Sequence, residues 1–406
     1  MNLEQIRQQF PSLSLKTYDR TTVFFDNAAG TQATKRCIDR ITDYFLTSNA
    51  NTHGLFETSR RSDQIIDQAR LAVADFISAP NQDEVAFGAN MTTLTQSFAR
   101  AFARSCKEGD EIVTTALEHE ANISPWLALQ EHGIKVRFAD INENATINLD
   151  SLRQQINSRT KLVAIGLASN AFGTINPVAE ASELAHKVGA VCFVDAVHYS
   201  PHGSINLAEL GCDVLVYSPY KSFGPHAGVL WGKREVLDKV KAYHLRTVAP
   251  VIPDKFETGT QNHEAIAGIL GSIEYLETLS NQGLTRRERL QNAFLQIKDY
   301  EEILSHKLMD IFEKYSKIRV YGITNRKLFN SRVPTFAIRV DGLSPQDVAE
   351  HLAKASINVW SGNYYALEPM TRLGLETSGG AVRISLVHYN SQEEIDYLEQ
   401  VLKQIC

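Results

Sequence analysis

The sequence predicts an α/β protein with two domains, a large one built on a mostly parallel sheet and a smaller α+β one. Three observations support this. Strand and helix patterns alternate between about residues 21 and 231, which is typical of parallel strands covered by helices on both faces. After residue 283 the order changes, and a long charged helical pattern precedes a second group of strands. A chain of 406 residues is also too long for one simple core.

The first part of the chain contains short apolar runs that we interpret as strands. They lie at 85–87, 111–114, 136–138, 162–167, 191–194 and 214–217. Amphipathic segments at 149–156 and 179–188 separate several of them and favour helices. In such a sheet, ligands bind at the carboxyl ends of the strands. We assign residues 21–284 to this large domain.

The C-terminal part is predicted to fold as a smaller unit, residues 285–406, with residues 1–20 packed on it. A charged helical pattern at 285–316 leads to strand-like residues 333–340. Ser344 and Pro345 then favour the start of a helix, with Asp347 near its positive end. A further strand at 381–386 precedes a last helix, which the residues from Ser391 to Glu394 open with a capping box.

Composition and charge exclude several classes of function. Hydrophobic residues make up 43% and charged residues 22% of the chain, as in ordinary globular proteins. The net charge of −6 gives no electrostatic argument for binding nucleic acid or an anionic membrane. The five cysteines have neither metal-type spacing nor the pattern of a disulfide framework. Residues 1–6 resemble a polar amphipathic helix more than a leader, and no apolar run approaches the length of a membrane span, so we expect a cytoplasmic protein.

Two residues at neighbouring strand ends point to pyridoxal 5′-phosphate (PLP). Asp195 ends one predicted strand, and Lys221 follows the next one in the loop that also contains Ser218. This cofactor needs a lysine for its Schiff base and a carboxylate that keeps its pyridine nitrogen protonated. Either residue alone is more often a surface lysine or a helix-capping aspartate. Their pairing favours the cofactor site.

Other residues meet further needs of this cofactor. Ala89 and Asn90 lie in a strand-to-helix turn that offers backbone donors to a phosphate. His119 follows a strand and has a flat ring that can stack on the cofactor, and Asn170 ends the next strand. Arg383, on a strand among apolar residues, is the best-placed partner for a substrate carboxylate. Each of these residues also has an ordinary structural interpretation, as a helix cap, a loop residue, a turn former or a member of an ion pair.

The order and spacing of these motifs together resemble the class V aminotransferase family, in particular its cysteine desulfurase and selenocysteine lyase branch. The resemblance extends over nearly the whole chain. The motifs that carry it are Phe24 to Ala29, Glu118 to Asn122, Asn170, Asp195, Ser218 to Lys221, Phe256 to Asn262, and Val382 with Arg383.

The resemblance implies a fold-type I homodimer whose active sites lie at the subunit interface and bind an amino acid substrate. Lys221 and His119 would be catalytic, and His119 would stack on the cofactor ring. The remaining cofactor residues would be Ala89, Asn90, Asn170, Asp195, His198, Ser218, Tyr220 and, across the subunit interface, Thr260. Asn51 and His53 match a segment that lines the substrate pocket, which Arg383 and Tyr365 would complete.

The departures from the family pattern are informative. Tyr365 stands where the desulfurases carry a cysteine on a mobile loop, and no cysteine lies between Cys212 and Cys406. A phenol cannot take up sulfur as a persulfide. Tyr220 replaces a common histidine, and His198 replaces a common glutamine. These differences favour a relative with different chemistry.

Three interpretations remain open. We favour a PLP-dependent enzyme that acts on an amino acid, with Lys221 as general base. Within it, a carbon–sulfur or other β- or γ-elimination needs no cysteine, whereas transamination needs a second substrate and epimerisation a second proton donor, such as Tyr364 or Tyr365. The second interpretation is a true desulfurase with a displaced nucleophile. The third is a non-catalytic interaction protein that kept the fold.

Overall fold

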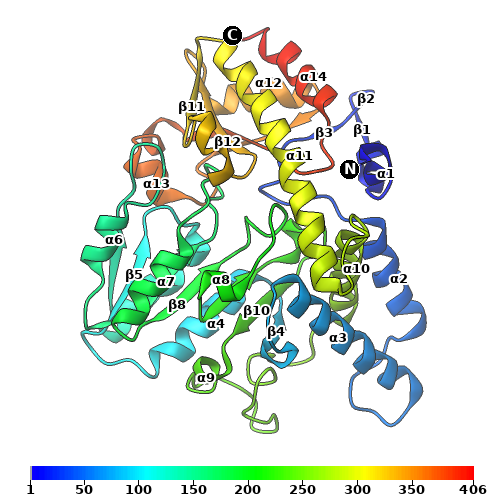
Figure 1. Ribbon diagram of the computed structural model, residues 1–406, viewed down its shortest axis with the longest axis vertical. Coiled ribbons are helices and arrows are strands. Elements are labelled where there is room, and N and C mark those ends of the chain that lie inside the picture. Colours follow the sequence, from blue (N-terminus) through cyan, green and yellow to red (C-terminus); the bar gives the residue numbers. More distant parts are fainter. Residues whose placement is uncertain (1) are drawn as a thin grey trace.

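The large sheet has seven strands in the order β4-β10-β9-β8-β7-β5-β6. It is seen in a computed structural model that describes residues 2–406 (Figure 1). Strands β5 to β9 run parallel to one another, while β10 is antiparallel to both β4 and β9. All six predicted strands are confirmed, with ends that differ by at most two residues. The seven strands are β4 (Val85–Gly88), β5 (Glu111–Thr115), β6 (Lys135–Ala139), β7 (Thr160–Gly166), β8 (Val191–Asp195), β9 (Val214–Tyr217) and β10 (Gly228–Gly232).

Both faces of this sheet are buried, which explains why its strands are continuous apolar runs. Successive side chains of a strand point to opposite faces. Val163 and Val194 accordingly join one hydrophobic cluster, whereas their neighbours Leu162 and Phe193 join another. The expected α/β architecture with a mostly parallel sheet is therefore confirmed.

Helices cover the sheet on both sides. Helix α7 packs on β7 and β8, and α4 packs on β9 and β10, while α10 packs on α2 and α3. The capping Asn90 side chain accepts from the N–H of Thr93 and opens α4. The helices of this part are α2 (Lys35–Thr47), α3 (Glu57–Phe76), α4 (Met91–Ala103), α5 (Ser124–Leu127), α6 (Leu149–Gln155), α7 (Val178–Lys187), α8 (Leu207–Leu210), α9 (Arg234–Leu237) and α10 (His263–Glu277).

The second sheet is smaller and antiparallel, in the order β11-β12-β15-β14. Phe336 and Ile384 lie in a third hydrophobic cluster under this sheet. The predicted capping boxes at Ser344 and Ser391 are confirmed at the starts of α12 and α14. The elements here are β11 (Ile318–Tyr321), β12 (Thr335–Val340), β13 (Ile357–Asn358), β14 (Trp360–Gly362), β15 (Ala381–Ser385), α12 (Pro345–Lys354), α13 (Leu367–Arg372) and α14 (Gln392–Leu402).

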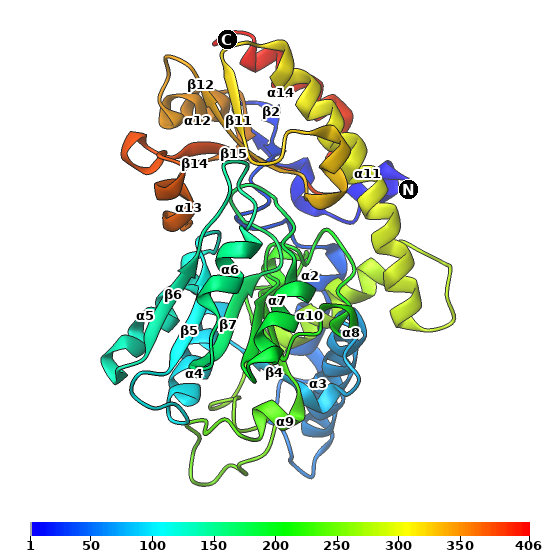
Figure 2. The same cartoon turned by 60° about the vertical axis from the view of Figure 1, so that its left-hand side comes forward.

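The long helix α11 (Arg286–Lys314) connects the two parts, as Figure 2 shows. A capping box formed by Thr285 and Glu288 opens it. Its early residues Leu290 and Phe294 belong to the core beneath the large sheet, whereas Leu304 and Leu308 belong to the core of the small sheet. One continuous helix therefore stabilises both cores.

The N-terminal segment lies beside the C-terminal elements. Strand β3 (Val23–Phe24) runs parallel to β13 and takes no part in the large sheet. Helix α1 (Leu3–Arg7) is held by Arg7, whose Nη1 lies 2.9 Å from the carboxylate of Glu394. Two further short strands, β1 (Lys16–Thr17) and β2 (Arg20–Thr21), form a hairpin between them. Within residues 2–406, none of the helices combines the length and the apolar character needed to cross a bilayer.

Candidate active site

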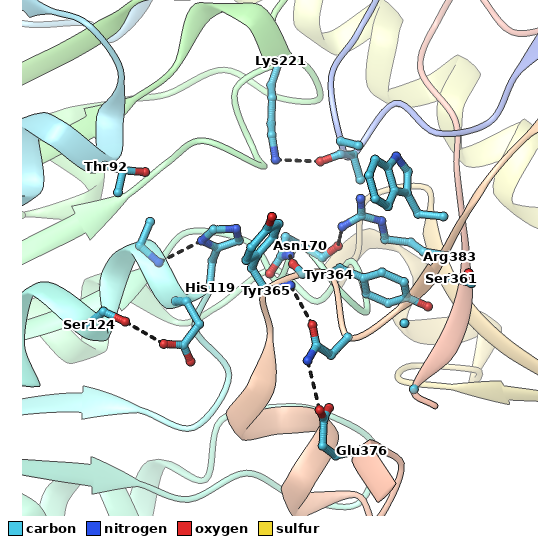
Figure 3. A pocket seen from close by; sticks show the side chains of 18 of the residues that line it. Thr92, His119, Ser124, Asn170, Lys221, Ser361, Tyr364, Tyr365, Glu376 and Arg383 are labelled. Atoms are coloured by element: carbon cyan, nitrogen blue, oxygen red, sulfur yellow. Dashed lines mark hydrogen bonds between the residues drawn. The ribbon is translucent and has the colours of Figure 1, made fainter. Parts of the chain in front are cut away.

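A cavity of about 810 Å³ opens at the carboxyl ends of the parallel strands, between the large and the small sheets (Figure 3). A smaller adjoining cavity of about 60 Å³ shares part of its lining. The structure brings together most of the residues predicted for the site. His119, Asn170, Tyr220 and Lys221 line both cavities, Arg383 and Tyr365 line the large one, and Asp195, His198 and Ser218 line the small one.

Lys221 is a buried lysine whose amine donates to a backbone carbonyl group. It ends the short helix Pro219–Lys221 that follows β9, and only 6% of it is exposed. Its Nζ donates to the carbonyl oxygen of Ala28 at 2.6 Å. Burial lowers the pKa of Lys221 to about 7, with a smaller contribution from the nearby charge of Arg383. Near pH 7, a substantial fraction of the protein molecules therefore carries Lys221 as a neutral, nucleophilic amine.

Asp195 lies at the end of β8 and is also buried. Its Oδ1 accepts from the backbone N–H of Val197 at 2.9 Å. Burial raises the pKa of Asp195 to about 6, while that hydrogen bond and the charge of Lys221 oppose the rise. The carboxylate is therefore ionised at neutral pH.

His119 presents a neutral ring to the cavity. Burial lowers its pKa to about 3, assisted by the charges of Lys221 and Arg383. The backbone N–H of Ala121 donates to Nδ1 at 2.9 Å, so the ring proton belongs on Nε2. The Tyr365 ring lies beside it, with centroids 5.7 Å apart.

Arg383 projects from β15 and is only 3% exposed. Its Nη1 donates to the carbonyl oxygen of Asn170 at 2.9 Å, and its guanidinium lies 4.6 Å from the centre of the Tyr364 ring. Its Nε has no partner among the described residues. A buried cation with a free donor at a cavity wall is suited to bind an anion.

The loop that carries Tyr364 and Tyr365 is held against the large domain. The carbonyl oxygen of Tyr365 accepts from the N–H of Glu120 at 2.7 Å, and that of Tyr364 accepts from Nδ2 of Asn170 at 2.9 Å. Both tyrosines adopt positive φ angles, of 55° and 57°. This conformation is uncommon for residues other than glycine, and the surrounding hydrogen bonds compensate for its cost.

A candidate phosphate site lies at the start of α4. The N–H of Met91 donates to Oγ of Ser218 at 2.9 Å, and Ala89 and Asn90 are exposed at the same end of the helix. Helix N-termini attract anions through their free N–H groups and the helix dipole.

The structure does not bring every predicted residue into this cavity. Asn51, His53 and Thr260 line a separate cavity of about 740 Å³ in the same chain. Sequence reasoning also missed three carboxylates: Glu118 lines the small cavity, and Glu120 and Glu376 line the large one. Burial raises the pKa of Glu118 to about 7.

These residues fit PLP. Nε2 of His198 and Oδ1 of Asn170, which line the small cavity, are buried polar atoms without a partner in residues 2–406, and a ligand would satisfy them. An ionised carboxylate and a partly neutral lysine line the same cavity, and a helix N-terminus lies at its edge.

The comparisons with known proteins agree with this fit. The model of the family "Aminotransferase class-V" matches residues 23–398. A cysteine desulfurase of Synechococcus elongatus is 32% identical over the whole of this chain, which spans 64% of that relative's length. The aminotransferase-like protein FGM3 of Gibberella zeae is 31% identical over the whole of this chain and 98% of its own.

Solved structures give the same result. The apo structure of a cysteine desulfurase from Thermococcus onnurineus superposes with a TM-score of 0.86 at 29% identity, covering 99% of this chain and 97% of the other. The chain belongs to the class V aminotransferase family. It is a PLP-dependent enzyme of fold type I, similar to the cysteine desulfurases.

Proposed function

We propose that the protein is a lyase that acts on an amino acid and releases its product directly, without holding sulfur on an enzyme cysteine. One observation carries this proposal. The residues that line the two adjoining cavities include no cysteine, and Tyr365 lies beside His119 at the cavity wall. Cys37, Cys192 and Cys212 are buried elsewhere.

The side chains have complementary tasks in this proposal. Bound PLP would supply an aldehyde for covalent attachment and a ring that accepts electrons from the substrate's α-carbon. Arg383 binds the substrate α-carboxylate through its free donors. The carboxylate of Asp195 would hold the pyridine nitrogen, and the neutral ring of His119 would contact the cofactor ring. The start of α4, with Ser218 and Asn90, would hold the phosphate.

Lys221 has two roles in the same proposal. Its neutral amine would hold the cofactor covalently, and Nζ would be the base that removes the proton from the substrate α-carbon. A pKa near 7 suits both roles, because the amine can take a proton and return it close to neutral pH.

We also propose a homodimer with shared active sites. Several large apolar side chains near α2 and α3 are exposed, among them Leu46, Leu55 and Phe56. Contiguous exposed apolar residues indicate an interaction surface. Thr260 is exposed in the separate cavity, where a second subunit can use it.

The test of the lyase proposal uses the cofactor-loaded protein with all five cysteines replaced by serine or alanine. We expect turnover of the amino acid substrate to persist, apart from a packing cost at the buried Cys192. Lys221→Ala serves as the inactive control. A second experiment incubates the unmodified, cofactor-loaded protein with L-cysteine and analyses it by mass spectrometry. A persulfide that forms and discharges at the rate of turnover, on Cys406 or any other cysteine, would restore the desulfurase interpretation.

A further inference from the structure

The large cavity continues past the catalytic lysine to a carboxylate that has an unused oxygen. Glu376 lies in the short helix Glu376–Ser378 after α13 and lines this cavity. Its Oε1 accepts from Nδ2 of Asn363 at 3.1 Å, but its buried Oε2 has no partner among the described residues. Buried carboxylate oxygens are normally hydrogen-bonded. Glu376 can therefore accept a donor from a ligand.

Neighbouring contacts fix the position of this carboxylate. Asn363 donates to Glu376 and, through Oδ1, accepts from the N–H of Tyr365 at 3.1 Å. The turn at Gly380 has a φ of 72°, and a side chain there would collide with the carbonyl oxygen of Gly362. Close contact between this turn and the tyrosine loop keeps Glu376 at the cavity wall.

Aromatic side chains also line this cavity. Trp360 is 48% exposed and Tyr365 is 70% exposed, and both line the cavity. Aromatic faces attract organic cations. A second carboxylate, Glu120, also lines the cavity, where its Oε2 accepts from Oγ of Ser124 at 2.8 Å.

The cavity lining carries charges of both signs. Arg383 supplies positive charge that suits the α-carboxylate of a substrate, and Glu376 and Glu120 supply negative charge. In Figure 3, Lys221 and Glu376 lie on opposite sides of the view, with Tyr365 between them. A volume of about 810 Å³ is within the range of pockets for drug-sized ligands, so the cavity can accept an amino acid with a long side chain.

We infer that the substrate is an α-amino acid whose side chain ends in a cation, an amine or a guanidinium. The α-carboxylate pairs with Arg383, and the terminal cation donates to Oε2 of Glu376. An acidic side chain would instead meet two carboxylates. This inference rests on the proposed function, since it needs a cofactor-loaded site that binds amino acids.

The experiment measures amino acid binding to the cofactor-loaded protein through the absorbance of the cofactor. The probes are L-arginine and L-lysine, with L-norleucine as an uncharged amino acid of similar length, L-glutamate as an acid and L-cysteine as a reference. We expect the better basic amino acid to bind at least about tenfold more tightly than norleucine, the effect of one hydrogen bond to a charged group. Glu376→Gln should abolish this preference, while Glu368→Gln, on neighbouring α13 and outside the cavity lining, should preserve it.

The outcomes separate the inference from the proposed function. Norleucine or glutamate binding as tightly as arginine and lysine would overturn the inference and leave the proposed function standing. A preference for basic amino acids that survives in Glu376→Gln would also overturn it. If none of the five amino acids changes the cofactor absorbance, both fail. The comparison of probes on the unmodified protein needs no variant, so poor folding of Glu376→Gln would not prevent the test.

Discussion

Nδ1 of His202 lies 2.8 Å from Oε2 of Glu301, and both side chains are almost fully buried. Glu301 belongs to α11, whereas His202 lies in the segment that follows β8. Burial raises the pKa of Glu301, and the charge and hydrogen bond of His202 oppose the rise. This buried contact holds α11 against the large domain. It lies close to His198, since the ring centroids of His198 and His202 are 5.5 Å apart.

Removing one partner of this pair should strongly destabilise the protein. We expect Glu301→Ala to lower the free energy of unfolding by about 3–5 kcal/mol, because it leaves the buried His202 without its partner. Chemical denaturation measures the change. Asp39→Ala, which breaks the exposed contact with Lys35, is the matched control and should cost about 1 kcal/mol or less. Equal losses of unfolding free energy in the two variants would contradict a stabilising role of the buried pair of His202 and Glu301.

The rate at which the cofactor-free protein captures PLP should rise as pH increases through about 7. The neutral amine of Lys221 is the attacking form, and its lowered pKa places the rise there, far below the ordinary value for lysine. Absorbance after rapid mixing measures the rate. The charge of Arg383 lowers this pKa and that of Asp195 raises it. Arg383→Gln should therefore move the midpoint to higher pH and Asp195→Asn to lower pH. Shifts in the same direction would refute the explanation.

Borohydride reduction of the cofactor-loaded protein should fix the cofactor on Lys221. Lys255 is the instructive comparison, because it is equally buried and its pKa is also lowered by burial. Its Nζ, however, donates to the carbonyl oxygens of Leu237 and Val240, away from the cavity. Peptide mapping should find the label on Lys221 alone. Label on Lys255 or any other lysine would contradict the role of Lys221 as the residue that binds the cofactor covalently.

Two inactive variants should complement each other if the sites are shared between subunits. Lys221→Ala removes the catalytic amine, and Thr260→Ala alters a residue of the separate cavity. Mixing the two proteins creates heterodimers in which one site keeps both residues, so part of the activity should return. Subunit exchange must be verified by native mass spectrometry. Absence of activity in proven heterodimers would show that Thr260 serves its own chain or no site at all.

Local sequence patterns predicted most of the fold, because each pattern has a local physical cause. The strands of the large sheet are continuous apolar runs since both faces are buried. Ser344 and Ser391 indicate helix starts, because each side chain accepts a hydrogen bond from the backbone N–H three residues later. The pairing of β3 with β13 could not be predicted this way, since two residues form no period and their partner lies in a distant part of the chain.

Much of the candidate site was predictable because it lies at strand ends. Asp195 ends a parallel strand, and Asn170 and His119 each come shortly after one, so the topology of the sheet brings them together. Glu118 adjoins His119 and was therefore within reach of the same reasoning. Glu376 was not, because its place depends on the packing of Gly380 against the tyrosine loop, which no local pattern records.

The pairing of β3 with β13 affects how the chain folds during synthesis. More than three hundred residues separate Val23 from its partner Ile357. Ribosomes add about 5–20 residues per second, so the first strand emerges about 15 to 70 s before its partner exists. During that interval the side chains of Val23 and Phe25 have no final burial site, because the other residues of their hydrophobic cluster belong to the C-terminal part of the chain. The large domain can assemble as it emerges, but the N-terminal segment must wait for nearly the whole chain, and a molecular chaperone that binds short apolar segments would find one there.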